Sequence, residues 1–257
     1  KNGDFLQYVL AEEDTLDNAA IYLLNLASGE SKLISEGMTS YFEVTFSPEA
    51  KYLSYLATDD SAKAKKPYHS VFLVETNKGE PKEIATKDSE GILSNGRISE
   101  NGNLKFSENE ERLFFGVAPD YVDYSYESDT TILDEDRVSL DIWGWQDSEI
   151  QPMQLKNKGR EERFSYLAAI DLNTDKITQL ADLDVKNVSL ESKVERDFGL
   201  AYSDDPYRIN YSWDIQIGRD LYLIDFTDGS KTLIEKDASG FPSISPEGKY
   251  VYWYDAR

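Results

Sequence analysis

The chain repeats one short phrase four times, and this repetition constrains the fold more than any other feature. In its clearest copy, at 241–254, an apolar strand is followed by a Ser-Pro-Glu-Gly turn and then by an aromatic strand. Less regular copies lie at 44–56, 104–116 and 188–202. Self-similarity at this spacing is the signature of a repeat architecture, and here the repeated unit consists of strands.

A second pattern alternates with the first: an apolar run, a polar turn and a shorter strand, found at 21–34, 71–84, 166–180 and 221–234. Its turn residues are typical of β-hairpins. The two patterns together give four strands in every roughly 40 to 60 residues, which predicts an all-β fold, a β-propeller built of four-stranded antiparallel blades. We expect the third strand of each unit to be covered on both faces, because its residues are almost all apolar.

The predicted blades form a partial propeller. We expect 1–257 to be a single propeller segment of about four blade equivalents. Complete blades are expected at 40–86, 100–182 and 186–236, and partial ones at 5–34 and 240–257. Either the two partial blades combine to close a small ring, or the chain is a segment of a larger propeller. We expect the second, because the first partial blade already has its own second strand and residue 1 is Lys rather than Met.

Composition narrows the classes of partner. The net charge of -22 comes from 27 basic and 49 acidic residues, so the chain repels nucleic acid and anionic membrane surfaces. No apolar run approaches the roughly 20 residues of a membrane-spanning helix, so no membrane insertion is expected. The chain has no cysteine, which excludes disulfides and cysteine metal sites. We expect no metal and no cofactor.

One insertion, at 118–162, separates the second and third strands of the third predicted blade. Insertions of this length usually have a function. Trp143 and Trp145 lie close together within it, among polar residues. Either both pack the insertion onto the blade, or they form an exposed aromatic lip that contacts a ligand or a partner. The acidic cluster Asp134, Glu135 and Asp136 is the other candidate contact in this segment.

Two stretches carry a family resemblance. The run at 140–154, together with 213–215 and 240–255, resembles the propeller of large bacterial exported peptidases of the prolyl oligopeptidase family. The shorter Ser-Pro-Glu-Gly-Lys-Tyr phrase also resembles the propellers of translocation-associated periplasmic proteins. The first resemblance implies peptide substrates, a periplasmic or exported location, and a C-terminal α/β-hydrolase domain outside this chain that carries a Ser-Asp-His triad.

No catalytic residue can be assigned within the chain itself. The sequence contains no Gly-x-Ser-x-Gly elbow, and its single histidine, His69, follows a Lys-rich turn where we expect a surface position. A triad therefore cannot be assembled. The acidic signature with which the dipeptidyl peptidase branch holds a substrate amine is also missing, so Asp134, Glu135 and Asp136 are not given that role.

Two functions remain open. The first is a non-catalytic propeller region of a prolyl oligopeptidase-like serine peptidase, which gates or binds peptides for the hydrolase domain. The second is a stand-alone periplasmic propeller that binds other proteins as a scaffold of the translocation-protein type. The apolar and aromatic end strands at 5–10 and 249–254 add a third expectation, self-association through open sheet edges.

Overall fold

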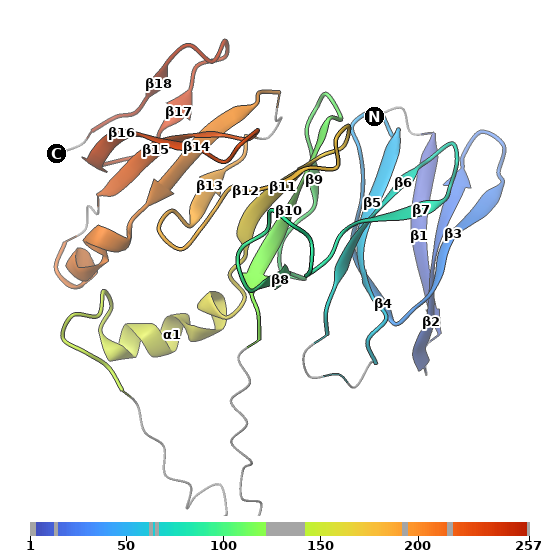
Figure 1. The fold of residues 1–257 in the computed structure, drawn as a ribbon, viewed down its shortest axis with the longest axis horizontal. Coiled ribbons are helices and arrows are strands. Elements are labelled where there is room, and N and C mark those ends of the chain that lie inside the picture. Colours follow the sequence, from blue (N-terminus) through green and yellow to red (C-terminus); the bar gives the residue numbers. More distant parts are fainter. Residues whose placement is uncertain are drawn as a thin grey trace, which may run out of the picture.

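The computed structural model describes residues 4–12, 15–61, 64, 67–121, 142–191, 195–214 and 218–255. Over these residues the chain is mostly β. Antiparallel sheets follow one another along the sequence and lie side by side in a row, with β1–β3 at one end and the β17–β18 hairpin at the other (Figure 1). This arrangement is consistent with a partial propeller.

The first two sheets are meanders in which every neighbouring pair is antiparallel. The first has three strands: β1 (Phe5–Glu12), β2 (Thr15–Asn25) and β3 (Ser31–Met38). The second has four: β4 (Ser40–Phe46), β5 (Tyr52–Thr58), β6 (Ser70–Glu75) and β7 (Pro81–Ala85).

The remaining sheets continue the same order. The third contains β8 (Gly96–Ile98), β9 (Lys105–Phe106), β10 (Arg112–Pro119), β11 (Tyr166–Asp171) and β12 (Ile177–Gln179). The fourth contains β13 (Asn187–Ser189), β14 (Phe198–Ser203), β15 (Arg219–Asp225) and β16 (Lys231–Ala238). The last is the hairpin of β17 (Ser243–Ile244) and β18 (Val251–Tyr252).

The repeated phrase forms the same tight turn wherever it is described. In three copies a serine hydroxyl accepts a hydrogen bond from the backbone N–H five residues later: Ser47 from Tyr52 at 2.9 Å, Ser107 from Arg112 at 3.0 Å and Ser245 from Tyr250 at 3.1 Å. The fourth residue of each turn, Ala50, Glu110 or Gly248, has a positive φ of 57°, 56° or 72°. The hydroxyl and the left-handed residue close the turn locally, which is why the hairpins can be predicted from sequence.

The third sheet departs from the expected bounds. It begins at Gly96 rather than at 100, and its first strand is divided into β8 and β9, which both pair with β10. The division falls where Gly102 approaches Gly116 on β10. A Cβ added to Gly102 would lie 2.4 Å from the Gly116 Cα, so only glycine allows the two backbones to come this close.

The core lies between successive sheets. Consecutive residues of β10 lie in different cores. Phe114 packs toward the fourth sheet, with Ile224 and Phe226. Phe115 packs toward the second sheet, with Leu56 and Val71. The second strands β5 and β10 are buried at nearly every position, whereas the third strands differ: β11 is mostly buried, and β6 and β15 are only partly buried. The expectation that the third strand is covered on both faces therefore fits β11, whose Ala168 and Ala169 lie in two adjacent cores, but not β6 and β15.

The two partial sheets do not combine. Within the described residues β1 pairs only with β2, and β18 pairs only with β17. They lie at opposite ends of the row in Figure 1, so the two ends do not close a ring in this structure.

Among the described residues, two helices were not expected from the sequence. They are α1 (Gln151–Glu161), inside the insertion, and a short 3-10 helix, η2 (Asp205–Ser212). Pro152 in the first turn and Lys158 and Arg160 in the last turn favour α1. No residue of α1 is buried, so it has no apolar face that periodicity could reveal. Neither helix could span a membrane, and no other helix among the described residues could either.

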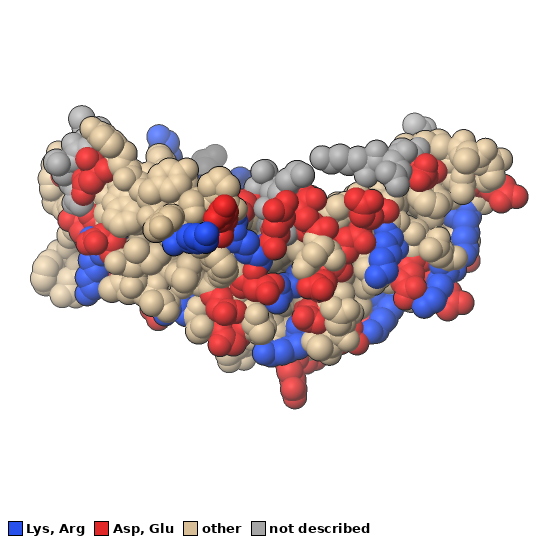
Figure 2. All heavy atoms as spheres, turned by 90° about the horizontal axis from the view of Figure 1, so that it is seen from above, with Lys and Arg blue, Asp and Glu red and all other residues tan. Residues whose placement is uncertain are grey.

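The surface charge is mixed. Figure 2 shows acidic and basic side chains interspersed over the visible face, which is hollowed along its upper side. On this face the acidic side chains are distributed among basic ones rather than gathered in one patch.

Candidate functional site

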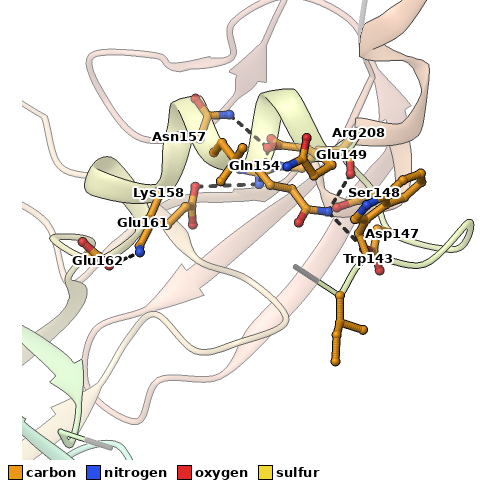
Figure 3. A pocket seen from close by; sticks show the side chains of 13 residues that line it. Trp143, Asp147, Ser148, Glu149, Gln154, Asn157, Lys158, Glu161, Glu162 and Arg208 are labelled. Carbon is orange, nitrogen blue, oxygen red and sulfur yellow. Dashed lines mark hydrogen bonds and ion pairs between the residues drawn. The ribbon is translucent and has the colours of Figure 1, made fainter. Parts of the chain in front are cut away.

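A hollow of about 670 Å³ lies between the loop at 142–149, α1 and Arg208 of η2 (Figure 3). This volume is within the range of ligand sites in proteins. Its wall combines exposed apolar side chains, Ile142, Trp143 and Leu155, with amides and charged groups.

The loop that carries Trp143 is held onto α1 by hydrogen bonds. The Gly144 N–H donates to Asp147 Oδ2 at 2.9 Å, and the Gln154 side chain donates to the same oxygen at 3.0 Å and to the Glu149 carbonyl at 2.7 Å. The bonds from the Gly144 backbone and from Gln154 lower the pKa of the Asp147 carboxyl. Trp143 is therefore presented at the rim by a hydrogen-bonded turn.

Arg208 is the central charged residue of the wall. Its Nη1 lies 3.5 Å from Glu149 Oε1 and 3.9 Å from Glu161 Oε1, and its Nε lies 3.4 Å from Asp204 and 3.3 Å from Asp205. The Arg208 side chain is only 16% exposed. Burial opposes its positive charge, but the four surrounding carboxylates outweigh this effect and raise the pKa of Arg208.

Further polar contacts complete this cluster. The Asn157 side chain donates to Glu149 Oε2 at 2.9 Å, and Lys186 Nζ lies 2.9 Å from Asp205 Oδ2. In the part of the chain that the structure describes, no group of three His, Asp or Glu side chains is placed to hold a metal ion. The carboxylates around Arg208 are paired with cationic side chains, Arg208 and Lys186, instead.

A second hollow of about 410 Å³ lies against the same wall. It shares Glu149, Asn157, Glu161 and Arg208 with the first and adds Met153, Phe164, Tyr202 and Tyr211. The Tyr211 hydroxyl donates to Asp204 Oδ2 at 3.0 Å, and burial together with that carboxylate raises the pKa of Tyr211.

The two candidate tryptophans differ in position. Trp143 lines the larger hollow and is 61% exposed, whereas Trp145 is 86% exposed and does not line it. Both side chains are exposed, and their contact with a ligand or a partner stays a prediction. The acidic cluster Asp134, Glu135 and Asp136 lies outside the described residues.

Sequence reasoning missed Arg208 and its carboxylates. The local signal was present, because Asp204 and Asp205 precede Arg208 by four and three residues, the spacing at which charged side chains meet on one helical turn. The contacts with Glu149 and Glu161 join distant parts of the sequence and have no such signal.

The expectation for His69 was wrong. Its side chain is 2% exposed, and its backbone bridges Ile98, which joins the second and third sheets. Its ring meets Phe42 edge-on at 5.3 Å, and Glu100 Oε2 lies 3.9 Å from Nδ1. Burial lowers the pKa of His69. The Lys-rich turn before it suggested exposure, but the contact between two sheets covers the residue.

No protein-family model matches the chain, and no curated protein matches it. Among solved structures, it is similar to TolB from Acinetobacter baumannii (14% identity over 98% of this chain and 47% of that chain, TM-score 0.40). It is also similar to the β-propeller domain of the Trilobed protease from Pyrococcus furiosus (12%, 100% and 67%, TM-score 0.48) and to Pyrococcus horikoshii acylaminoacyl peptidase (14%, 94% and 32%, TM-score 0.45). The chain spans less than half the length of TolB and of acylaminoacyl peptidase. These similarities are low and carry no information about what this chain binds.

Proposed function

We propose that this chain is a non-catalytic binding module whose larger hollow receives an extended polypeptide. The observation that carries the proposal is the exposure of Ile142, Trp143 and Leu155, at 87%, 61% and 54%, around a hollow of ligand size. Exposed apolar side chains gathered beside polar groups mark interaction sites, and tryptophan is enriched among the residues that dominate binding energy.

The polar groups of the hollow suit a peptide. The Ser148 hydroxyl and the side-chain oxygens of Gln154 and Asn157 can accept hydrogen bonds from the N–H groups of a peptide backbone. The charged residues of the wall are four carboxylates, Asp147, Glu149, Glu161 and Glu162, against two cations, Lys158 and Arg208. This excess, within a chain of net charge -22, favours a polypeptide with basic side chains.

The proposal of a protein family for this chain rests on the residues at 140–154 and 240–255. On their resemblance we propose that the chain is the propeller region of an exported or periplasmic serine peptidase of the prolyl oligopeptidase family. There it would bind or gate peptides for a hydrolase domain outside this chain. One observation favours the alternative, a protein-binding scaffold: Trp145 and Ile150, 86% and 55% exposed, lie outside the larger hollow and suit a broader partner surface.

The test compares two tryptophans, Trp143 and Trp145, that are separated by a single glycine. Binding of a fluorescent, basic, proline-containing peptide is measured by anisotropy, with an acidic peptide of equal length as the ligand control. We expect Trp143→Ala to weaken binding by about tenfold or more, as for a residue central to an interface, and Trp145→Ala to change it little.

The outcomes separate the candidates. Equal losses in both variants would favour the broad scaffold surface over the hollow. Failure of the wild-type chain to bind the basic peptide more tightly than the acidic one would contradict the proposal.

A further inference from the structure

The attachment of α1 to the rest of the molecule is unusual. No residue of α1 is buried, and Met153, which faces the smaller hollow, is only partly covered. A helix of 11 residues is marginally stable in isolation, and helices in proteins are normally held by an apolar face. Polar contacts must therefore hold α1 in place.

One guanidinium contacts both ends of this helix. Glu149 lies just before α1, and Glu161 is its last residue; both carboxylates approach Arg208 Nη1 (Figure 3). The Glu149 side chain is only 10% exposed, so the contact at the start of the helix is well covered. Arg208 itself belongs to η2, which precedes β15 of the fourth sheet.

The balance of charge depends on the same residue. Asp204 and Asp205 on the side of the fourth sheet face Glu149 and Glu161 on the side of the insertion, with Arg208 between them. Without the guanidinium, the two pairs of carboxylates would repel one another. The four N···O distances of 3.3–3.9 Å exceed the roughly 2.7–2.9 Å of charge-assisted hydrogen bonds, and Arg208 Nε has no hydrogen-bond partner among the described residues. The attraction is mainly Coulombic. Salt weakens chiefly the contact with Glu161, whose side chain is 43% exposed, and screens the covered Glu149 contact much less.

We propose that α1 is a flap latched by Arg208, and that the latch decides whether the larger hollow exists. Six residues of α1 line this hollow and would leave it if the helix detached: Gln151, Gln154, Leu155, Asn157, Lys158 and Glu161. The claim that this latch controls polypeptide binding rests on the proposed function. The claim that Arg208 holds α1 in place does not. A polypeptide would bind only the latched form, and its binding would in turn hold α1 closed.

The latch is tested without any ligand, by hydrogen exchange of the α1 amides and by trypsin cleavage after Lys156 and Lys158. We expect Arg208→Met to accelerate both by about tenfold or more, because removal of one partner leaves covered carboxylates uncompensated. Arg208→Lys, which keeps the charge, should lie between Arg208→Met and the wild type. Arg196→Met is the matched control, because Arg196 is also mostly covered, at 18% exposure, and pairs with Glu191 away from α1.

The salt dependence of α1 hydrogen exchange distinguishes a latch from a merely structural arginine. Added salt should accelerate α1 exchange in the wild type. In Arg208→Met it should leave exchange unchanged or slow it, because salt there screens the repulsion between the carboxylates, and β10 should remain protected in both. Exchange of α1 in Arg208→Met as slow as in the wild type, or an equal rise in β10, would overturn the latch.

Peptide binding then tests control of the hollow separately. If Arg208→Met exchanges rapidly at α1 but binds the basic peptide as tightly as the wild type, the regulatory proposal is wrong. If neither protein binds the peptide, the proposed function fails, and the exchange data still decide the latch.

Discussion

Replacing His69 by Phe should remove a pH-dependent loss of stability. The imidazole is 2% exposed at the junction of two sheets, and its Nδ1 has no hydrogen-bond partner within the described residues. The nearest carboxylate, Glu100 Oε2 at 3.9 Å, is already bound by Arg97 Nη1 at 2.6 Å. A proton on His69 would therefore be buried beside a second cation, with a carboxylate that is already paired.

The sign of the effect follows from the direction of the shift. Burial lowers the pKa of folded His69 below the ordinary value of about 6.5, although Glu100 and Asp60 oppose this shift and Arg97 adds to it. As the pH falls, the unfolded chain binds the proton first. The stability due to neutral His69 is thus fully present above about pH 6.5 and is lost between there and the lower folded pKa. One proton corresponds to a slope of at most about 1.4 kcal/mol per pH unit.

Glu100 acts in a separate and lower window. Its burial tends to raise the carboxyl pKa, but the hydrogen bond from Arg97 and other favourable contacts outweigh this, and the pKa of folded Glu100 is lowered. Its contribution is therefore lost only as the pH falls from the ordinary value of about 4.3 through the folded pKa.

The assay is urea unfolding of the wild type and of His69→Phe at a series of pH values between about 7.5 and 5, above the carboxylate window. At pH 7.5 the variant should be within about 1 kcal/mol of the wild type, because Phe keeps the edge-on contact with Phe42 and removes an unpartnered polar atom. As the pH falls, the wild type should lose more stability than the variant, by up to about 1.4 kcal/mol per pH unit. Parallel pH profiles would refute the reasoning.

Two further predictions concern packing and association. Phe114→Ala should lower the free energy of unfolding, measured in urea, by about 3–5 kcal/mol, because Phe114 is fully buried and its ring meets Phe226 edge-on at 5.3 Å. Tyr254→Ala, at an 80% exposed site, should lower it by less than about 0.5 kcal/mol. Similar losses in the two variants would contradict the packing of Phe114 between the third and fourth sheets. The outer edges of β1 and β18 have no strand partner among the described residues, so light scattering should show self-association of this chain that Tyr252→Lys on β18 reduces. A monomer at every concentration would count against the open edges.

The repeat and its hairpins were accessible from the sequence because their causes are local. A serine such as Ser47 accepts a hydrogen bond from a residue five positions on, and in the second pattern Asp171 Oδ1 accepts hydrogen bonds from the N–H groups of Asn173 and Thr174. Such contacts involve only neighbours in the chain, so each copy of a phrase folds in the same way wherever it occurs. The antiparallel sheets follow from this repetition.

Tertiary structure alone decided the site. Arg208 meets Glu149 and Glu161 only because the insertion and the fourth sheet come together, and the sequence contains no periodic signal for that contact. The burial of His69 likewise depends on the neighbouring sheet, to which it is bridged at Ile98. Hydrogen bonds between close neighbours are set by residue order, whereas the exposure and charge balance of a side chain depend on whatever distant segments the packed sheets place around it.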